Sequence, residues 1–184
     1  MWRSAPFCGY DLLTKFCDCD GMSNYIRPRL SGATIFFTVN LVNRTSDLLV
    51  REVGGLRDAF MRTISDRRFY IDAVVILPDH LHMVMTLPDG DDDYATRWRV
   101  IKARFSRGVG QGHVRPSHIR RGERGIWQRR YWEHHIRDEG DYRAHVEYCW
   151  KNPVKHGLVE KPADWPYSSI HRDIKEGRVP PEWQ

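Results

Sequence analysis

Residues 69–87, FYIDAVVILPDHLHMVMTL, decide how this chain folds. The first half, Phe69–Leu77, is apolar and rich in β-branched residues, which favours a strand. Pro78 and Asp79 are typical of a turn, and the residues after them alternate between two faces as a second strand would. The stretch therefore predicts an antiparallel hairpin.

The second strand of this hairpin has two unlike faces. One face is wholly apolar and should pack on a core, while the other carries His80 and His82 side by side on a rigid backbone. Two such imidazoles can hold one metal ion. With nine histidines in the chain, a pair of this kind also arises by chance, so two strand histidines that bind nothing are the plainer alternative.

Residues 139–159 predict a helix near the C-terminus. Asp141 is its candidate N-cap, Pro153 is expected to end it, and Gly157 marks the loop that follows. One face should be buried through an apolar stripe at helical spacing: Tyr142, Val146, Cys149 and Trp150.

Tyr148 and Asn152 lie off that stripe. They are four residues apart and therefore neighbours on one face of the helix, where a phenol and a carboxamide project together. The plain alternative is a tyrosine at the edge of the core and an asparagine that ends a helix.

The remaining pattern completes an α+β domain. The order strand, helix, strand, strand, helix, strand, helix predicts a ferredoxin-like antiparallel sheet with an extra C-terminal helix. We expect residues 1–22 to be a poorly ordered N-terminal extension and residues 23–184 to form one domain. The other expected elements are a strand at 34–42, a helix at 51–65, a helix at 94–107, a loop at 108–124 and a strand at 125–136.

Positive charge is concentrated in residues 97–130. This segment holds ten arginines and one lysine against a single glutamate, while the whole chain carries a net charge of only +5. Trp98, Phe105 and Trp127 interleave with the charge, a combination that favours nucleic acid over a merely solvated loop.

The composition does not support a disulfide-rich, secreted, membrane or nucleotide-binding protein. The four cysteines include no Cys-x-x-Cys pair, and a disulfide framework is not expected in a chain of this size. We find no secretory signal, no apolar run long enough for a membrane and no nucleotide-binding motif, so we expect a cytoplasmic protein without a nucleotide cofactor.

Two of these segments together resemble one family. Leu-Pro-Asp-His80-Leu-His82, followed far downstream by His145-Val-Glu-Tyr148 and Asn152-Pro-Val-Lys-His-Gly, resembles the REP-associated tyrosine transposases, relatives of the single-tyrosine HUH transposases. The matches keep the family order over about residues 24–183. Further matching stretches are 36–41, 87–93, 97–99, 126–128, 131–134 and 165–168.

The resemblance implies a role for each matching residue. His80 and His82 would bind a divalent cation, Asn152 would be a third ligand, and Tyr148 would attack a DNA phosphate to form a 5′-phosphotyrosine. Neutral imidazole and amide ligands suggest Mg²⁺ or Mn²⁺. The fold would be of the HUH endonuclease type, with the tyrosine on the extra helix and the site completed within a monomer.

The same resemblance implies the DNA partner, which is a single strand folded into a repetitive extragenic palindrome (REP) hairpin. We expect the basic segment, residues 97–130, to bind the backbone of this hairpin. The expected contacts are Arg97, Arg99, Lys102, Arg104, Arg107, Arg120, Arg121, Arg129 and Arg130.

Three other functions stay open from the residues alone. The first is a hairpin-DNA-binding regulator that does not cleave, and the second is an RNA-binding module. The third is a metal-dependent phosphohydrolase that uses water and forms no covalent adduct.

Overall fold

The structure, a computed structural model, describes residues 29–110, 112 and 124–183. The expected extension at residues 1–22 lies outside the described residues, as does most of the expected loop at 108–124. Within the described chain the strands are β1 (Thr34–Asn40), β2 (Tyr70–Ile76), β3 (His80–Thr86) and β4 (Trp132–His135). The helices are α1 (Leu48–Arg51), α2 (Val53–Asp66), α3 (Tyr94–Val109), α5 (Glu139–Lys155) and α6 (Ile170–Lys175), with 3-10 turns η1 (Pro162–Asp164) and η2 (Pro181–Trp183).

The four strands form one sheet in the order β2-β3-β1-β4, and each neighbouring pair is antiparallel. The predicted hairpin is present, since Ile76 of β2 lies opposite Leu81 of β3. The expected ferredoxin-like antiparallel arrangement is confirmed, and it places β1 and β3 in the middle of the sheet.

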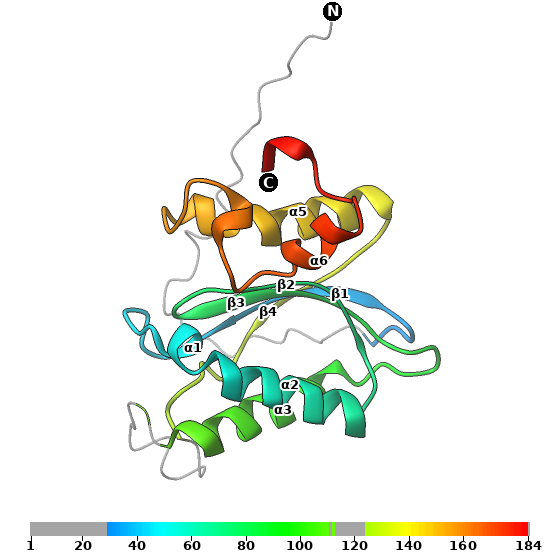
Figure 1. Ribbon diagram of the computed structural model, residues 1–184. Coiled ribbons are helices and arrows are strands. Elements are labelled where there is room, and N and C mark those ends of the chain that lie inside the picture. Colours follow the sequence, from blue (N-terminus) through cyan, green and yellow to red (C-terminus); the bar gives the residue numbers. More distant parts are fainter. Residues whose placement is uncertain (1–28, 111, 113–123, 184) are drawn as a thin grey trace, which may run out of the picture.

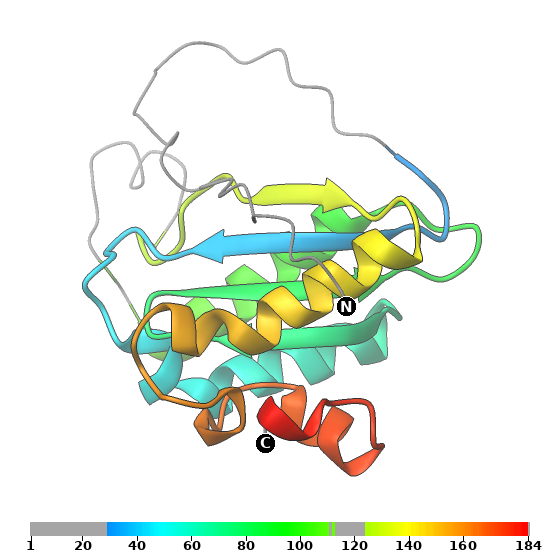
Figure 2. The ribbon, with the colours of Figure 1, turned by 90° about the horizontal axis from the view of Figure 1, so that it is seen from above.

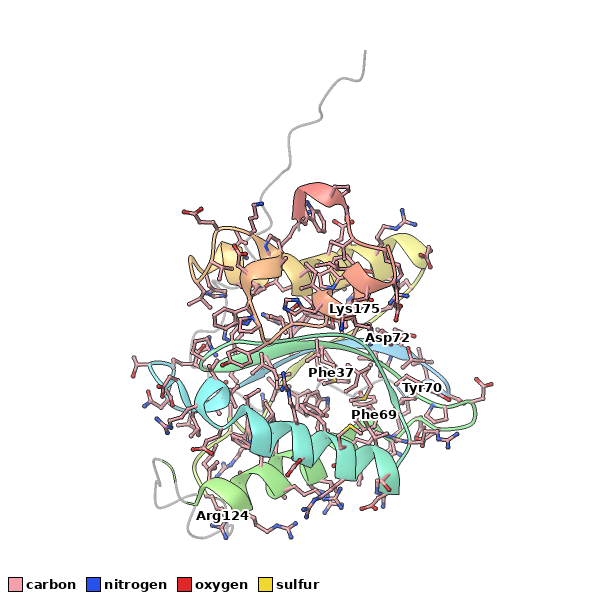
Figure 3. The ribbon with its side chains drawn as sticks, in the orientation of Figure 1. Phe37, Phe69, Tyr70, Asp72, Arg124 and Lys175 are labelled. Carbon is pink, nitrogen blue, oxygen red and sulfur yellow. The ribbon has the colours of Figure 1, made fainter. Side chains whose placement is uncertain are left out.

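The sheet lies between two layers of helices. Figure 1 shows α2 and α3 below the sheet and α5 and α6 above it, and the view from above in Figure 2 agrees. Phe37 and Phe69 belong to the lower core, toward α2 and α3, while Asp72 lies on the α6 side (Figure 3). Because the two faces of each strand point into different layers, the alternation along β3 decides which side chains meet which helix.

The lower core takes the apolar face of β3 and the upper core takes the face that carries the histidines. Leu81, Met83 and Met85 pack with residues of α2 and α3, whereas Val84 packs with Val146 and Trp150 of α5. This is the pattern that alternation predicted. It brings the histidine face directly beneath α5.

The segment after η1 closes the free edge of β2. Backbone bonds join Ile76 N to the Tyr167 carbonyl at 2.9 Å and Ser169 N to the Val74 carbonyl at 2.8 Å. The Trp165 indole donates to the Ile76 carbonyl at 2.9 Å. The tail after α5 therefore holds the helix layer to the sheet rather than trailing from it.

Two predicted boundaries of α5 were wrong. The helix begins at Glu139, because the Asp138 side chain accepts a bond from Asp141 N at 2.9 Å and takes the N-cap position. Pro153 does not end the helix, which continues to Lys155. Pro153 is buried, and Gly157, at φ +66°, terminates the last turn instead.

The other element predictions differ from the structure mainly at their ends. The strand expected at 125–136 is regular only at Trp132–His135, although Val42 N still bonds to the Ile126 carbonyl at 2.9 Å. The helix expected at 51–65 begins at Val53, and the turn before it is the separate α1. No helix in the described part of the chain is long and apolar enough to cross a membrane.

Candidate functional site

The two strand histidines lie between the sheet and α5. His80 and His82 are 5% and 1% exposed, and their rings are 5.0 Å apart, centroid to centroid. They are opposite Asn40 and Thr38 of β1 respectively. Their burial beneath a helix distinguishes them from the pair of exposed strand histidines that chance alone would give.

His82 is held so that one nitrogen is left for a ligand. Its Nδ1 is 2.9 Å from the Thr38 hydroxyl, whereas its buried Nε2 has no hydrogen-bond partner in the described chain. Burial, with a smaller electrostatic effect of the neighbouring His80 and His156 in the same direction, lowers the pKa of His82 well below its usual value. The ring is therefore neutral at pH 7, which is the state that binds a metal.

His80 is oriented by an acid that precedes it. Its Nδ1 is 2.7 Å from the Asp79 carboxylate, which also pairs with Arg44 at 3.0 Å. Burial raises the pKa of Asp79, but the hydrogen bond from His80 and the charge of Arg44 outweigh burial and lower it overall. A carboxylate on Nδ1 fixes the ring orientation and leaves Nε2 as the atom able to face a ligand.

Tyr148 approaches the same place from α5. Its ring centroid is 5.1 Å from that of His82 and 5.7 Å from that of Phe36, and Lys155 Nζ is 5.5 Å from the ring centre. The half-buried phenol thus stands beside His82, the neighbour of His80, within a single chain. The structure brings together the tyrosine and the histidines that the motifs predicted to act as one site.

Asn152 completes the group one helical turn later. It is 1% exposed, and neither its Oδ1 nor its Nδ2 has a hydrogen-bond partner in the described residues. Buried amides are normally hydrogen-bonded. An unpaired imidazole nitrogen on His82 and an unpaired amide oxygen on Asn152 are neutral donors of the kind that would hold a divalent cation.

Sequence reasoning missed one neighbour of this group. His156 follows α5, and its ring is 5.1 Å from that of His80. The prediction that Pro153 ends the helix left His156 in a loop without a location. A helix that continues to Lys155 would have predicted that His156 lies at the helix end, one turn beyond Asn152.

A second histidine and carboxylate group links β4 to the start of α5. His134 Nε2 is 2.8 Å from the Asp141 carboxylate, and His145 Nδ1 is 3.1 Å from the same group. The ligand atoms of these three residues lie within 4.8 Å of one another, close enough to share a metal ion. The sequence did not predict a function for these three residues, because they come from two different elements.

Some cations of the basic segment are held by contacts within the protein, whereas others are exposed. Arg97, predicted to contact DNA, is 2% exposed and donates to both oxygens of Asp91, at 2.9 and 2.6 Å. It also donates to the Asp93 carbonyl at 2.9 Å. A buried guanidinium held in this way is structural, so we remove Arg97 from the expected DNA contacts.

Arg104 is also engaged within the protein, with Asp66 and with the Thr63 hydroxyl. Arg99 and Arg107 are exposed on α3, and Arg129 and Arg130 are exposed before β4. Arg120 and Arg121 lie outside the described residues.

Several of these cations surround a cavity of about 570 Å³ between α3 and residues 124–131. We call it the α3 pocket. Arg99, Lys102, Arg107 and Arg129 line it together with Arg124, which Figure 3 shows at the end of α3. The basic segment therefore encloses a concavity on the side of the sheet opposite α5.

The known proteins that are most similar to this chain in the comparisons are REP-associated tyrosine transposases. The REP-associated tyrosine transposase of Escherichia coli (strain K12) is 47% identical over 162 residues, covering 88% of this chain and 91% of that protein. A putative REP-associated tyrosine transposase of Haemophilus influenzae is 43% identical over 164 residues, covering 88% of this chain and 93% of that protein. No family model matches the chain.

Among the solved structures that are similar to this chain is one described as a REP-associated tyrosine transposase bound to a REP hairpin. It is 47% identical, superposes with a TM-score of 0.79, and the match covers 89% of this chain and 92% of that chain.

Proposed function

The chain belongs to the REP-associated tyrosine transposase family, as its motifs predicted, and we propose that it cleaves and rejoins single-stranded hairpin DNA through Tyr148. The observation that carries the proposal is the approach of Tyr148 to His82, whose buried Nε2 has no hydrogen-bond partner in the described chain. Asn152, four residues after Tyr148 on the same helix, also has a buried and unpaired side chain there. Such unpaired groups destabilise a fold unless a ligand uses them.

The proposed reaction is a transesterification. The Tyr148 oxygen attacks a DNA phosphorus and forms a 5′-phosphotyrosine bond, while the bond from phosphorus to the 3′ oxygen breaks. The phenol proton is released, and the departing oxygen takes up a proton as a free 3′-hydroxyl. The reverse attack by that hydroxyl rejoins DNA, and the phosphotyrosine conserves the bond energy, so no nucleotide cofactor is needed.

A free tyrosine has a pKa near 10 and is a weak nucleophile at pH 7. In the proposed site His80, His82 and Asn152 would hold a divalent cation, and their neutral nitrogen and oxygen ligands favour Mg²⁺ or Mn²⁺. When bound, that ion would polarise the scissile phosphate and stabilise the charge on the leaving oxygen. Lys155, beside the Tyr148 ring, adds a second positive charge at the same place.

The proposed partner is a REP-type hairpin, since the similar solved protein is described as bound to one. The elements that carry Tyr148 and the histidines meet within one chain, which supports a monomer acting in cis. Exposed cations at Arg99, Arg107, Arg129 and Arg130 are the proposed contacts to the DNA backbone, with Lys102 beside them.

The test uses an end-labelled hairpin from the host genome, incubated with protein and Mn²⁺ and run on a denaturing gel. We expect a retarded covalent band that disappears with EDTA and with Tyr148→Phe. The matched control is Tyr142→Phe, which alters a phenol on the same helix but away from the histidines. A native-gel complex without any covalent band would instead support the hairpin-binding regulator, and cleavage that survives Tyr148→Phe would support hydrolysis by water.

A further inference from the structure

The group of His134, Asp141 and His145 joins the last strand of the sheet to the first turns of α5. His134 lies on β4, the end strand of the order β2-β3-β1-β4. Asp141 and His145 are four residues apart on α5 and are therefore neighbours on one face of the helix. In Figure 2 the chain leaves β4 and turns directly into α5. The proposed chemistry at Tyr148 uses none of the three residues, so their meeting needs an explanation of its own.

The two imidazoles converge on one carboxylate. His134 Nε2 is 2.8 Å from one oxygen of Asp141, and His145 Nδ1 is 3.1 Å from the other oxygen. One ligand atom from each of the three residues lies within 4.8 Å of the other two. Zinc binds nitrogen and oxygen at about 2.0–2.2 Å, which separates two of its ligand atoms by about 3–4 Å. Small side-chain movements would therefore bring all three atoms onto one ion.

Both rings are held in place by packing. The His134 ring is stacked on Trp132, with 5.9 Å between centroids and 5° between planes. The His145 ring is stacked on His134 at 4.7 Å and 16°, and it contacts Phe36 at 4.7 Å. Ligands that are already ordered lose little conformational freedom when they bind, so this packing favours an ion at the group.

The group is neither closed to solvent nor fully open to it. The side chains of His134, His145 and Asp141 are 26%, 21% and 10% exposed, so an ion can reach them from water. The Arg137 guanidinium also contacts Asp141, at 3.4 Å, and its positive charge opposes a metal ion. However, Arg137 is 76% exposed and can turn toward solvent when an ion binds.

The ligand types narrow the choice of ion. Two imidazoles and one carboxylate are a ligand set that zinc uses in sites where water takes the fourth position. Mg²⁺ prefers six oxygen ligands, so it would bind two nitrogen atoms poorly. The group also differs from the proposed site at His80, His82 and Asn152, because it includes an anionic ligand that offsets part of the charge of the ion.

We propose that His134, Asp141 and His145 bind a Zn²⁺ ion that fastens β4 to the start of the tyrosine-bearing helix. In the metal-free protein His134 Nε2 donates to the carboxylate, and His145 Nδ1 donates to the Asp141 backbone carbonyl at 2.8 Å. When the ion binds, each imidazole carries its proton on the other ring nitrogen, through exchange with solvent, and the freed lone pair binds the metal. This role is structural and requires neither DNA nor cleavage.

The test compares zinc binding in variants that keep the packing. His145→Phe keeps an aromatic ring between Phe36 and His134 but removes a ligand nitrogen, and His134→Gln removes the other imidazole. The matched control is His171→Gln, because His171 is half-buried outside the group and donates to the Trp165 carbonyl at 2.9 Å. Circular dichroism in EDTA establishes that each variant folds.

Calorimetric titration of the EDTA-treated, dialysed proteins with Zn²⁺ measures how many ions bind. His145→Phe and His134→Gln should each bind one ion fewer than the wild type, and His171→Gln should bind as many. The double variant His80→Gln with His82→Gln should keep one Zn²⁺ ion, which the further change His145→Phe should remove. Free Zn²⁺ at about 100 times the Kd should raise the Tm of this double variant by about 5–10 °C.

Two results would overturn the proposal. One is the same number of Zn²⁺ ions in the wild type and His145→Phe, a comparison that holds even where the double variant does not fold. The other is a folded double variant that binds no Zn²⁺ and whose Tm does not rise with it. The three residues would then form a hydrogen-bonded junction between β4 and α5 and no metal site, whatever the outcome of the cleavage assay.

Discussion

At the scale of single residues, Asn152 illustrates how a proposed metal ligand can destabilise the fold that carries it. Its side chain is 1% exposed with both polar atoms unpartnered in the described chain, a situation that typically costs about 1–3 kcal/mol. We predict that Asn152→Leu raises the free energy of unfolding of the metal-free protein by about 1 kcal/mol. The same change should weaken Mn²⁺ binding about tenfold or more, because one proposed ligand is removed.

Urea unfolding in EDTA measures the first effect, and calorimetric titration with Mn²⁺ measures the second. Asn43→Leu is the control, since Asn43 is exposed and its Oδ1 accepts a bond from Thr45 N at 3.0 Å. That variant should gain no stability and should bind the metal as the wild type does. Unchanged Mn²⁺ binding in Asn152→Leu would remove Asn152 from the proposed ligands.

The spacing of residues was enough to predict most of the site but not all of it. The two-residue alternation of a strand placed His80 and His82 on one face, and the four-residue spacing of a helix placed Tyr148 beside Asn152. What spacing within one element does not encode is contact between two elements, such as the approach of His134 on β4 to Asp141 on α5.

Arg97 was misjudged for a different reason. It follows Tyr94 by three positions and precedes Ile101 by four, so helical periodicity already placed it on the inward face of α3. Its charge suggested solvent, but Asp91 satisfies that charge inside the protein.

At the scale of elements, Pro153 shows why local rules mislocate helix ends. Proline removes one N–H and so one helical bond, but its fixed φ suits a helix. The remaining turn is kept by bonds such as His156 N to the Asn152 carbonyl at 3.0 Å. The extra turn carries Lys155 to the Tyr148 ring and His156 to His80, so the helix end contributes directly to the site.

The junction of β4 and α5 provides a prediction about pH. Burial raises the pKa of Asp141, but hydrogen bonds from His134 and from Arg137 outweigh burial and bring it down to about 2. A pKa below the unfolded value of 3.8 stabilises the fold above that value, and the contribution is lost as pH falls through the folded pKa. We predict that Asp141→Asn lowers the free energy of unfolding at pH 7 by about 1–2 kcal/mol.

The difference between wild type and Asp141→Asn should shrink as pH falls from about 4 to about 2, as measured by urea unfolding at a series of pH values. Asp138→Asn is the matched control three residues earlier, because asparagine caps a helix as well as aspartate does. A difference that stays constant down to pH 2 would mean that the Asp141 charge contributes nothing to stability.

At the scale of the whole molecule, the sheet separates two proposed functions, which are the cleavage of hairpin DNA and the binding of its backbone. The proposed chemistry lies between the sheet and α5, while the exposed arginines of α3 lie on the far side (Figures 1 and 2). The sequence indicated a basic segment and a catalytic segment. Only the packing of α3 and α5 against opposite faces of the sheet shows that the two segments lie on opposite sides of the molecule.

This separation predicts that the positive charge on α3 affects the affinity for the hairpin but not the rate at which the covalent adduct forms. Arg99→Ala combined with Arg107→Ala should weaken hairpin binding and reduce the slope of log affinity against log salt by about 0.7–0.9 for each phosphate that these arginines neutralise. At saturating DNA the rate of covalent adduct formation should equal that of the wild type, because neither side chain lies near Tyr148. Gel-shift titrations at several salt concentrations measure the affinity and its salt slope, and single-turnover assays measure the rate of adduct formation.

The matched control is the double variant Arg57→Ala with Arg62→Ala, since both arginines are exposed on α2. This variant should leave the salt slope unchanged. A lower saturating rate with an unchanged salt slope would show that α3 acts on the chemical step, and the division of labour between the two faces would then be wrong.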